Sequence, residues 1–179
     1  MSAFGRALYG DPCRGCGYHW STSAAEADAI VAALPAAVDD ALVGADGTEV
    51  VSGLTWPTAA YVAHIADNLH IWSERLVAVA AGSDAAVASY DQDQLGATRS
   101  YTTMPLVSAR WSLGRAATLL HPEQGPLALD DVARMVSHDG FHHVEDLRRV
   151  VAATRARASA HPATARPRLH RAETSGIVV

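Results

Sequence analysis

With 179 residues the chain has the size of one domain and can remove roughly 70% of its unfolded surface from water, so folding alone requires neither a metal nor a disulfide. About half of the residues are apolar, aromatic residues are few and alanine is abundant, a composition that favours packed helices over a β-sandwich. The net charge of −5, with basic residues concentrated only near the C-terminus, argues against nucleic acid as a partner.

The sequence also bears on the compartment. It shows no signal-peptide pattern, and no uninterrupted apolar run reaches about 18 residues. We therefore expect a cytoplasmic protein that does not interact with a membrane. In a reducing compartment, the two cysteines are more often thiols or metal ligands than a structural disulfide.

The first region, residues 1–22, is rich in glycine and shows no helical period, so we expect a loop. It contains Cys13-Arg-Gly-Cys16-Gly17, in which two thiolates can face one ion while glycine relieves the backbone, and His19 adds a third candidate ligand. Three interpretations remain open: a structural zinc site, a reactive or redox thiol pair, and ordinary cysteines. The absence of a surrounding βαβ pattern disfavours a thioredoxin-like role.

Two helices are predicted between residues 23 and 82. The first begins near Ser23, which forms a capping box with Glu26, and apolar residues follow at four-residue spacing. The second follows Thr55-Trp56-Pro57, where a threonine cap and a proline in the first turn suit a helix start, and Gly82 ends it.

Two more helices are predicted after a polar, aperiodic connection over residues 83–101. One begins at Thr103-Met104-Pro105 and ends before His121-Pro122; the other runs from Asp130 to Arg157, with acidic residues at its start and basic residues at its end. Residues 158–179 are expected to be a tail. Four helices with one long connection predict an all-α fold, a four-helix bundle over residues 23–157.

Three histidines form the candidate metal site. His138 and His142 are four residues apart, so on a helix their imidazoles lie one turn apart, about 6 Å along the axis, and can reach one ion. Packing the helix that carries His64 beside them is expected to add a third imidazole. Three neutral imidazoles and one open position are typical of catalytic zinc, and activity should fall below about pH 6 as the imidazoles become protonated.

Acidic and basic neighbours of this trio are candidates for proton transfer. Asp146 shares a helix face with His142, as an acceptor for an imidazole N–H or as a ligand itself. As a ligand it would make a site of two histidines and one carboxylate, which suits ferrous iron. Glu145 and His143 are candidates for general acid–base catalysis.

The pattern Trp56 with Tyr61-Val-Ala-His64, followed about seventy residues later by His138-x-x-x-His142, resembles the DinB/YfiT-like superfamily of four-helix-bundle metalloproteins. The resemblance covers about residues 23–155. It implies a divalent metal, zinc or nickel, on His64, His138 and His142 at one mouth of the bundle. It also implies thiol chemistry, since the superfamily includes bacillithiol and mycothiol S-transferases and the mycothiol-dependent maleylpyruvate isomerase. The N-terminal cysteines and the tail lie outside the family pattern.

Three functions follow as hypotheses. The first is a metal-dependent enzyme that transfers a low-molecular-weight thiol, such as mycothiol, to an electrophilic small molecule. The second is hydrolysis, isomerisation or cyclisation in small-molecule biosynthesis, with the metal as a Lewis acid and no thiol. The third is a metal-binding stress or interaction protein without a catalytic step. The sequence allows a homodimer.

Overall fold

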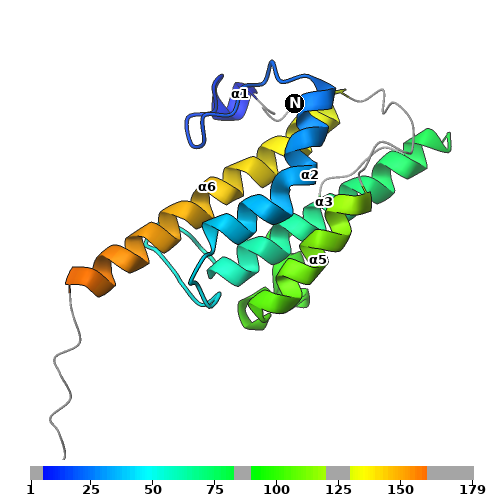
Figure 1. Cartoon of the computed structure of the whole chain (residues 1–179). Coiled ribbons are helices and arrows are strands. Elements are labelled where there is room, and N and C mark those ends of the chain that lie inside the picture. Colours follow the sequence, from blue (N-terminus) through cyan, green and yellow to red (C-terminus); the bar gives the residue numbers. More distant parts are fainter. Residues whose placement is uncertain (1–5, 83–89, 120–129, 161–179) are drawn as a thin grey trace, which may run out of the picture.

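The chain is all-helical over residues 6–82, 90–119 and 130–160, which are the residues that the computed structural model describes (Figure 1). This confirms the predicted all-α class. The expected tail beyond residue 160 lies outside the described residues. The helices, in chain order, are α1 (Arg6–Tyr9), α2 (Ala24–Ala41), α3 (Thr58–Ala80), α4 (Gln92–Thr98), the 3-10 helix η1 (Tyr101–Thr103), α5 (Leu106–Leu119) and α6 (Asp130–Ala160).

The long helices begin where the sequence signals predict. At the start of α2, the Ser23 hydroxyl accepts from the Glu26 backbone N–H, and the Glu26 carboxylate accepts from the Ser23 backbone N–H at 2.8 Å. This is the predicted capping box, which satisfies donors that a helix start leaves unpaired. Helix α5 begins one residue after Pro105, and α6 begins at Asp130 as expected.

The connection between α3 and α5 contains a helix that was not predicted. Asp91 caps α4 by accepting hydrogen bonds from the backbone N–H groups of Asp93 and Gln94, both at 2.9 Å. Helix α4 is short and exposed along most of its length. Its sequence is therefore polar and lacks the apolar period of a core helix. Cap chemistry, rather than periodicity, was the signal for this element.

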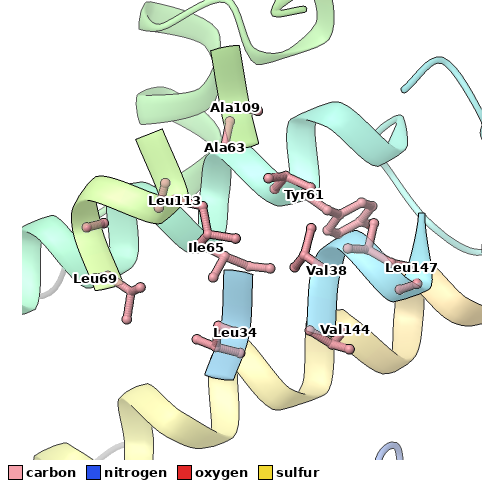
Figure 2. Close-up of a cluster of buried hydrophobic side chains, with 14 of the residues drawn as sticks. Leu34, Val38, Tyr61, Ala63, Ile65, Leu69, Ala109, Leu113, Val144 and Leu147 are labelled. Atoms are coloured by element: carbon pink, nitrogen blue, oxygen red, sulfur yellow. The ribbon is translucent and has the colours of Figure 1, made fainter. Parts of the chain in front are cut away.

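The core lies between α2, α3, α5 and α6. Helix α3 packs along α5, α2 packs along α6, and α3 also contacts α6. Figure 2 shows side chains from all four helices meeting in one cluster. The labelled members include Leu34 and Val38 of α2, Ile65 and Leu69 of α3, Leu113 of α5, and Val144 and Leu147 of α6, all of them buried.

The N-terminal segment, residues 6–22, lies against the first half of α6 (Figure 1). Tyr18 Oη and Ser137 Oγ share a buried hydrogen bond of 2.7 Å, and Arg134 Nε donates to the Thr22 carbonyl at 2.6 Å. These contacts hold residues 13–16 beside α6. Among the described helices, none has the length and apolar character needed to cross a membrane.

Candidate metal centres

Helix α6 carries two adjacent rows of possible metal ligands. His138 and His142 form one row, and Asp139 and His143 form the other, each pair separated by four residues. A shift of one residue on an α-helix turns the side chain by about 100°, so the two rows face different neighbours. Helix α6 lies between the N-terminal segment and α3, and each of them supplies ligands to one row.

The first row meets the two cysteines of the N-terminal segment. Cys13, Cys16, His138 and His142 each offer one ligand atom, and these four atoms all lie within 4.8 Å of one another. The Cys13 Sγ lies 3.7 Å from His142 Nδ1. We call these four residues the Cys₂His₂ group.

The second row meets α3. His64, Asp139 and His143 offer three ligand atoms that also lie within 4.8 Å of one another. Asp139 lies between the two imidazoles: its Oδ2 is 3.8 Å from His64 Nε2, and its Oδ1 is 3.7 Å from His143 Nε2. We call these three residues the His₂Asp group.

The structure does not bring the expected trio together in one ligand group. His64 joins Asp139 and His143, whereas His138 and His142 join the cysteines. The expectation assumed that the 138/142 row faces α3, but α6 is turned so that the 139/143 row does. The spacing of four residues pairs His138 with His142 as expected from helix geometry, but in the structure it is the 139/143 row that shares a ligand group with His64.

The third ligand suggested for the cysteine knuckle, His19, lies elsewhere. Its side chain is exposed and belongs to neither ligand group among the described residues. The backbone carbonyl of His19 instead accepts hydrogen bonds from the Thr22 backbone and hydroxyl, which form a local turn. Two histidines of α6 take the place that His19 was expected to fill.

Burial keeps three of the imidazoles neutral, which is the form that binds metals. It lowers the pKa of His138 to about 4, with the nearby His142 as the second cause, and it lowers the pKa values of His142 and His64 below their ordinary range. Within the described part of the chain, His138 Nε2 and His64 Nδ1 are buried without a hydrogen-bond partner. A buried nitrogen without a partner is costly, so His138 Nε2 is a candidate for a ligand contact. His64 presents its other ring nitrogen, Nε2, to Asp139.

The thiol of Cys16 is also shifted. Burial is the main cause that raises its pKa to about 12. At neutral pH this group is therefore a thiol unless a cation stabilises the thiolate, and a thiol is a poor nucleophile. The shift weighs against a redox or reactive pair at Cys13 and Cys16.

Asp146 lies between the two groups and belongs to neither. Its Oδ2 accepts from His143 Nδ1 at 3.2 Å and lies 3.7 Å from His142 Nε2, while its Oδ1 accepts from Arg149 at 2.7 Å. Burial opposes a charge on His143, yet Asp139 and Asp146 raise its pKa above the ordinary value. The carboxylate thus occupies the position of an outer acceptor, one of the two roles that the sequence left open.

Glu145 and His143, the candidates for general acid–base catalysis, are placed differently from each other. Glu145 accepts a hydrogen bond from Arg148 and lies outside both groups. His143 lies inside the His₂Asp group, where it is a candidate ligand.

Sequence reasoning missed Asp139 and the residues that orient it. The Asn68 side-chain amide donates to Asp139 Oδ2, and the Tyr90 hydroxyl donates to Asn68 Oδ1 at 3.2 Å. The signal was present, because Asp139 and His143 have the same four-residue spacing as His138 and His142. Asn68 lies one turn after His64 on α3, on the same face.

Comparison with protein-family models, with curated proteins and with solved structures gives no match to this chain.

Proposed function

We propose that the chain is a metal-dependent enzyme of the DinB-like four-helix-bundle type and that the His₂Asp group holds its catalytic divalent ion. The observation that carries the proposal is the convergence of His64, Asp139 and His143 from two helices whose sequence positions are far apart. His64 is only 2% exposed, and its lowered pKa keeps it neutral at physiological pH. A buried imidazole beside a carboxylate and a second imidazole fits an ion better than it fits a packed apolar core.

The chemistry of the donors supports a catalytic ion. Three protein ligands leave positions for a reactant, as in catalytic zinc sites with two histidines and one carboxylate. The same donors suit ferrous iron, so zinc, nickel and iron are the ions to test. When bound, the ion lowers the pKa of a coordinated thiol or water into the physiological range.

The surrounding residues fix the ligands for this role. Asp146 accepts from His143 Nδ1, which leaves Nε2 directed toward Asp139. Asn68 holds one oxygen of Asp139. Trp56 packs against the ring of His64 with a centroid distance of 5.4 Å. Such hydrogen bonds and ring contacts restrict the ligand rotamers, which lowers the cost of ordering them around an ion.

For the reaction, we propose transfer of a low-molecular-weight thiol of the mycothiol type to an electrophilic small molecule. The resemblance to the DinB/YfiT-like superfamily supports this choice of substrate. In that reaction the thiol loses its proton and its sulfur forms a bond to the electrophilic carbon. The bond from that carbon to its leaving group breaks at the same time, and the leaving group departs as an anion with the bonding electrons. A cation held by His64, Asp139 and His143 would favour the thiolate over the thiol, and the thiolate is the stronger nucleophile.

The test uses the metal-loaded full chain with a panel of electrophiles, with and without added mycothiol. The wild type should turn over at least one electrophile only when the thiol is present. His64→Ala should lower this turnover by about 100-fold or more, because it removes a ligand of the ion. His70→Ala is the matched control, since His70 lies on the same helix but in neither group, and it should retain wild-type turnover.

Other outcomes select other functions. Turnover without thiol would replace the transfer with Lewis-acid hydrolysis, isomerisation or cyclisation at the same ion. Metal binding without any turnover would favour a stress or interaction protein that binds metal. Equal turnover by the wild type and His64→Ala would contradict a catalytic ion on the His₂Asp group.

A further inference from the structure

The Cys₂His₂ group is separate from the proposed catalytic centre, and the residues that form it come from two distant parts of the chain. Cys13 and Cys16 lie in the N-terminal segment, whereas His138 and His142 lie on α6. To form this group, the fold must bring a tight turn onto one particular face of a long helix.

The turn that carries the cysteines is closely defined. The Cys13 N–H donates to the Tyr18 carbonyl at 2.7 Å, and the Gly17 N–H donates to the Cys13 carbonyl at 2.8 Å. Gly17 has a φ of +79°, a left-handed conformation that favours glycine. The backbone therefore returns on itself directly after Cys16, which brings both sulfur atoms to the same side of the segment.

Gly15, between the cysteines, allows the turn to approach α6. A Cβ at this position would lie 2.5 Å from His142 Cε1, closer than any ordinary contact. Only a residue without a side chain permits this approach while the imidazole keeps its position. The structure thus places the cysteine turn directly on a histidine ring, and the Arg149 guanidinium donates to the Gly15 carbonyl at 3.4 Å.

The imidazole of His138 is enclosed by aromatic rings. Trp20, Tyr9 and Tyr18 have ring centroids 4.5, 4.8 and 5.3 Å from its own. The residue is 4% exposed, and its Nε2 lacks a hydrogen-bond partner among the described residues. A buried imidazole nitrogen in apolar surroundings requires a partner, and a metal ion can supply it.

The distances suit a tetrahedral ion. Zinc bonds of about 2.3 Å to sulfur and about 2.0–2.1 Å to nitrogen place neighbouring ligand atoms about 3.3–3.8 Å apart. Cys13 Sγ and His142 Nδ1 are already 3.7 Å apart. Since all four ligand atoms lie within 4.8 Å of one another, no pair needs to close by more than about 1–1.5 Å to reach these distances.

From these observations we infer that Cys13, Cys16, His138 and His142 bind a structural Zn²⁺ that fastens the N-terminal segment to α6. Two thiolates and two imidazoles form a closed set of four ligands, which is the composition of structural rather than catalytic zinc. The inference goes beyond the proposed function and does not rest on it. Its consequence is that the ion adds to the contacts of Tyr18 and Thr22 with α6 and fixes residues 6–22 more firmly beside that helix.

Cobalt substitution of the reduced full chain tests this inference. Cobalt bound by thiolates gives a near-ultraviolet charge-transfer band, which a site of histidine and aspartate does not give. The wild type should show the band at one equivalent of thiolate-bound cobalt. The double variant Cys13→Ser/Cys16→Ser should lose it, and His138→Ala should weaken cobalt binding at this site by at least 10-fold.

Two control variants establish that the band reports on the Cys₂His₂ group. His19→Ala changes an exposed histidine of the same segment and should keep the full band. His64→Ala should also keep the band although it removes a ligand of the His₂Asp group, so failure of the proposed function leaves the zinc inference standing. A folded wild type without the band, or a band that persists in the double cysteine variant, would overturn the inference.

A structural consequence provides a second readout. Chelation of the ion should weaken the attachment of residues 6–22 to α6, so limited proteolysis should cut this segment at least 10-fold faster while the rest of the chain keeps its helical circular dichroism. The double cysteine variant should be cut rapidly with or without the chelator. Equal cutting rates for the zinc-loaded and zinc-free wild type would contradict a fastening role.

Discussion

The rotation of α6 decides which ligand row meets which neighbour, and a glycine at the contact between α2 and α6 offers a way to test it. Gly140 lies between Asp139 and His142 in the sequence, and a Cβ at this position would lie 2.5 Å from Leu34 Cδ1 and 3.0 Å from Leu34 Cδ2. Leu34 is itself buried at 2% exposure, so it has little space to move away. Gly140 therefore sets how closely α2 approaches the metal-binding part of α6.

We predict that Gly140→Ala destabilises the chain although alanine is the better helix former. The helix propensity gained is about 1 kcal/mol, and the overpacking against Leu34 costs about 1–3 kcal/mol, so the free energy of unfolding should fall by about 0–2 kcal/mol. Gly114→Ala is the matched control, because Gly114 also lies inside a helix but a Cβ there meets nothing within 4 Å. This control should gain about 1 kcal/mol.

The assay is denaturant unfolding of both variants and the wild type with a chelator present, so that metal binding does not alter the apparent stability. The two variants should differ by about 1–3 kcal/mol, which is the overpacking cost alone. If Gly140→Ala stabilises the chain as much as Gly114→Ala does, the close contact between α2 and α6 is absent and the rotation assigned to α6 loses its support.

Three further predictions concern the acidic groups and histidines. Asp146→Ala should weaken metal binding at the His₂Asp group by about 10–100-fold in a competition titration, because the acceptor for His143 is lost; unchanged affinity would exclude that role. In the metal-free chain, His138 takes up a proton near pH 6.5 in the unfolded state but only near pH 4 in the folded state. Neutral His138 therefore contributes its full stabilisation above pH 6.5, and the free energy of unfolding should fall by about 3 kcal/mol between pH 6.5 and pH 4. Denaturant unfolding across this range should show the fall, and His138→Gln should reduce its slope; equal slopes would refute the assignment. Tyr101→Phe should lower the free energy of unfolding by about 1.5–3 kcal/mol, because the buried Asp67 carboxylate loses a hydrogen bond, and a change below about 0.5 kcal/mol would show that water replaces it.

Much of the fold follows from local chemistry in the sequence. Ser23 with Glu26, Pro105 before α5, and Asp130 at the start of α6 are signals within a few residues of the helix ends that they set. Such signals depend on backbone donors that a helix start leaves unpaired, so they can be found without knowledge of the tertiary structure. The helix α4 was missed because its signal, the Asp91 cap, is not accompanied by an apolar stripe.

The ligand grouping could not be predicted in the same way. The sequence shows that His138 and His142 share a helix face, and it shows the same for Asp139 and His143, but it does not show which face meets α3. That choice depends on long-range packing, including the contact of Leu34 with Gly140 and the contact of Tyr18 with Ser137. A turn of about 100° exchanges the partners of the two rows.

The two cysteines show the same limit of prediction from sequence, because their distant ligand partners could not be identified. The spacing of Cys13 and Cys16 indicates a turn that can face one ion, and it leaves the remaining ligands unspecified. The nearest histidine in sequence, His19, was the natural candidate, yet the structure supplies two histidines more than a hundred residues away. Knowledge of the fold was needed to find them.

The central claim is that α6 serves two separate metal centres, one with His64 and one with the cysteines. Anomalous diffraction at the zinc absorption edge from crystals of the zinc-loaded chain would test it most directly. We predict two peaks: one bound by Cys13, Cys16, His138 and His142, and another bound by His64, Asp139 and His143. A single peak held jointly by His64, His138 and His142 would contradict this arrangement.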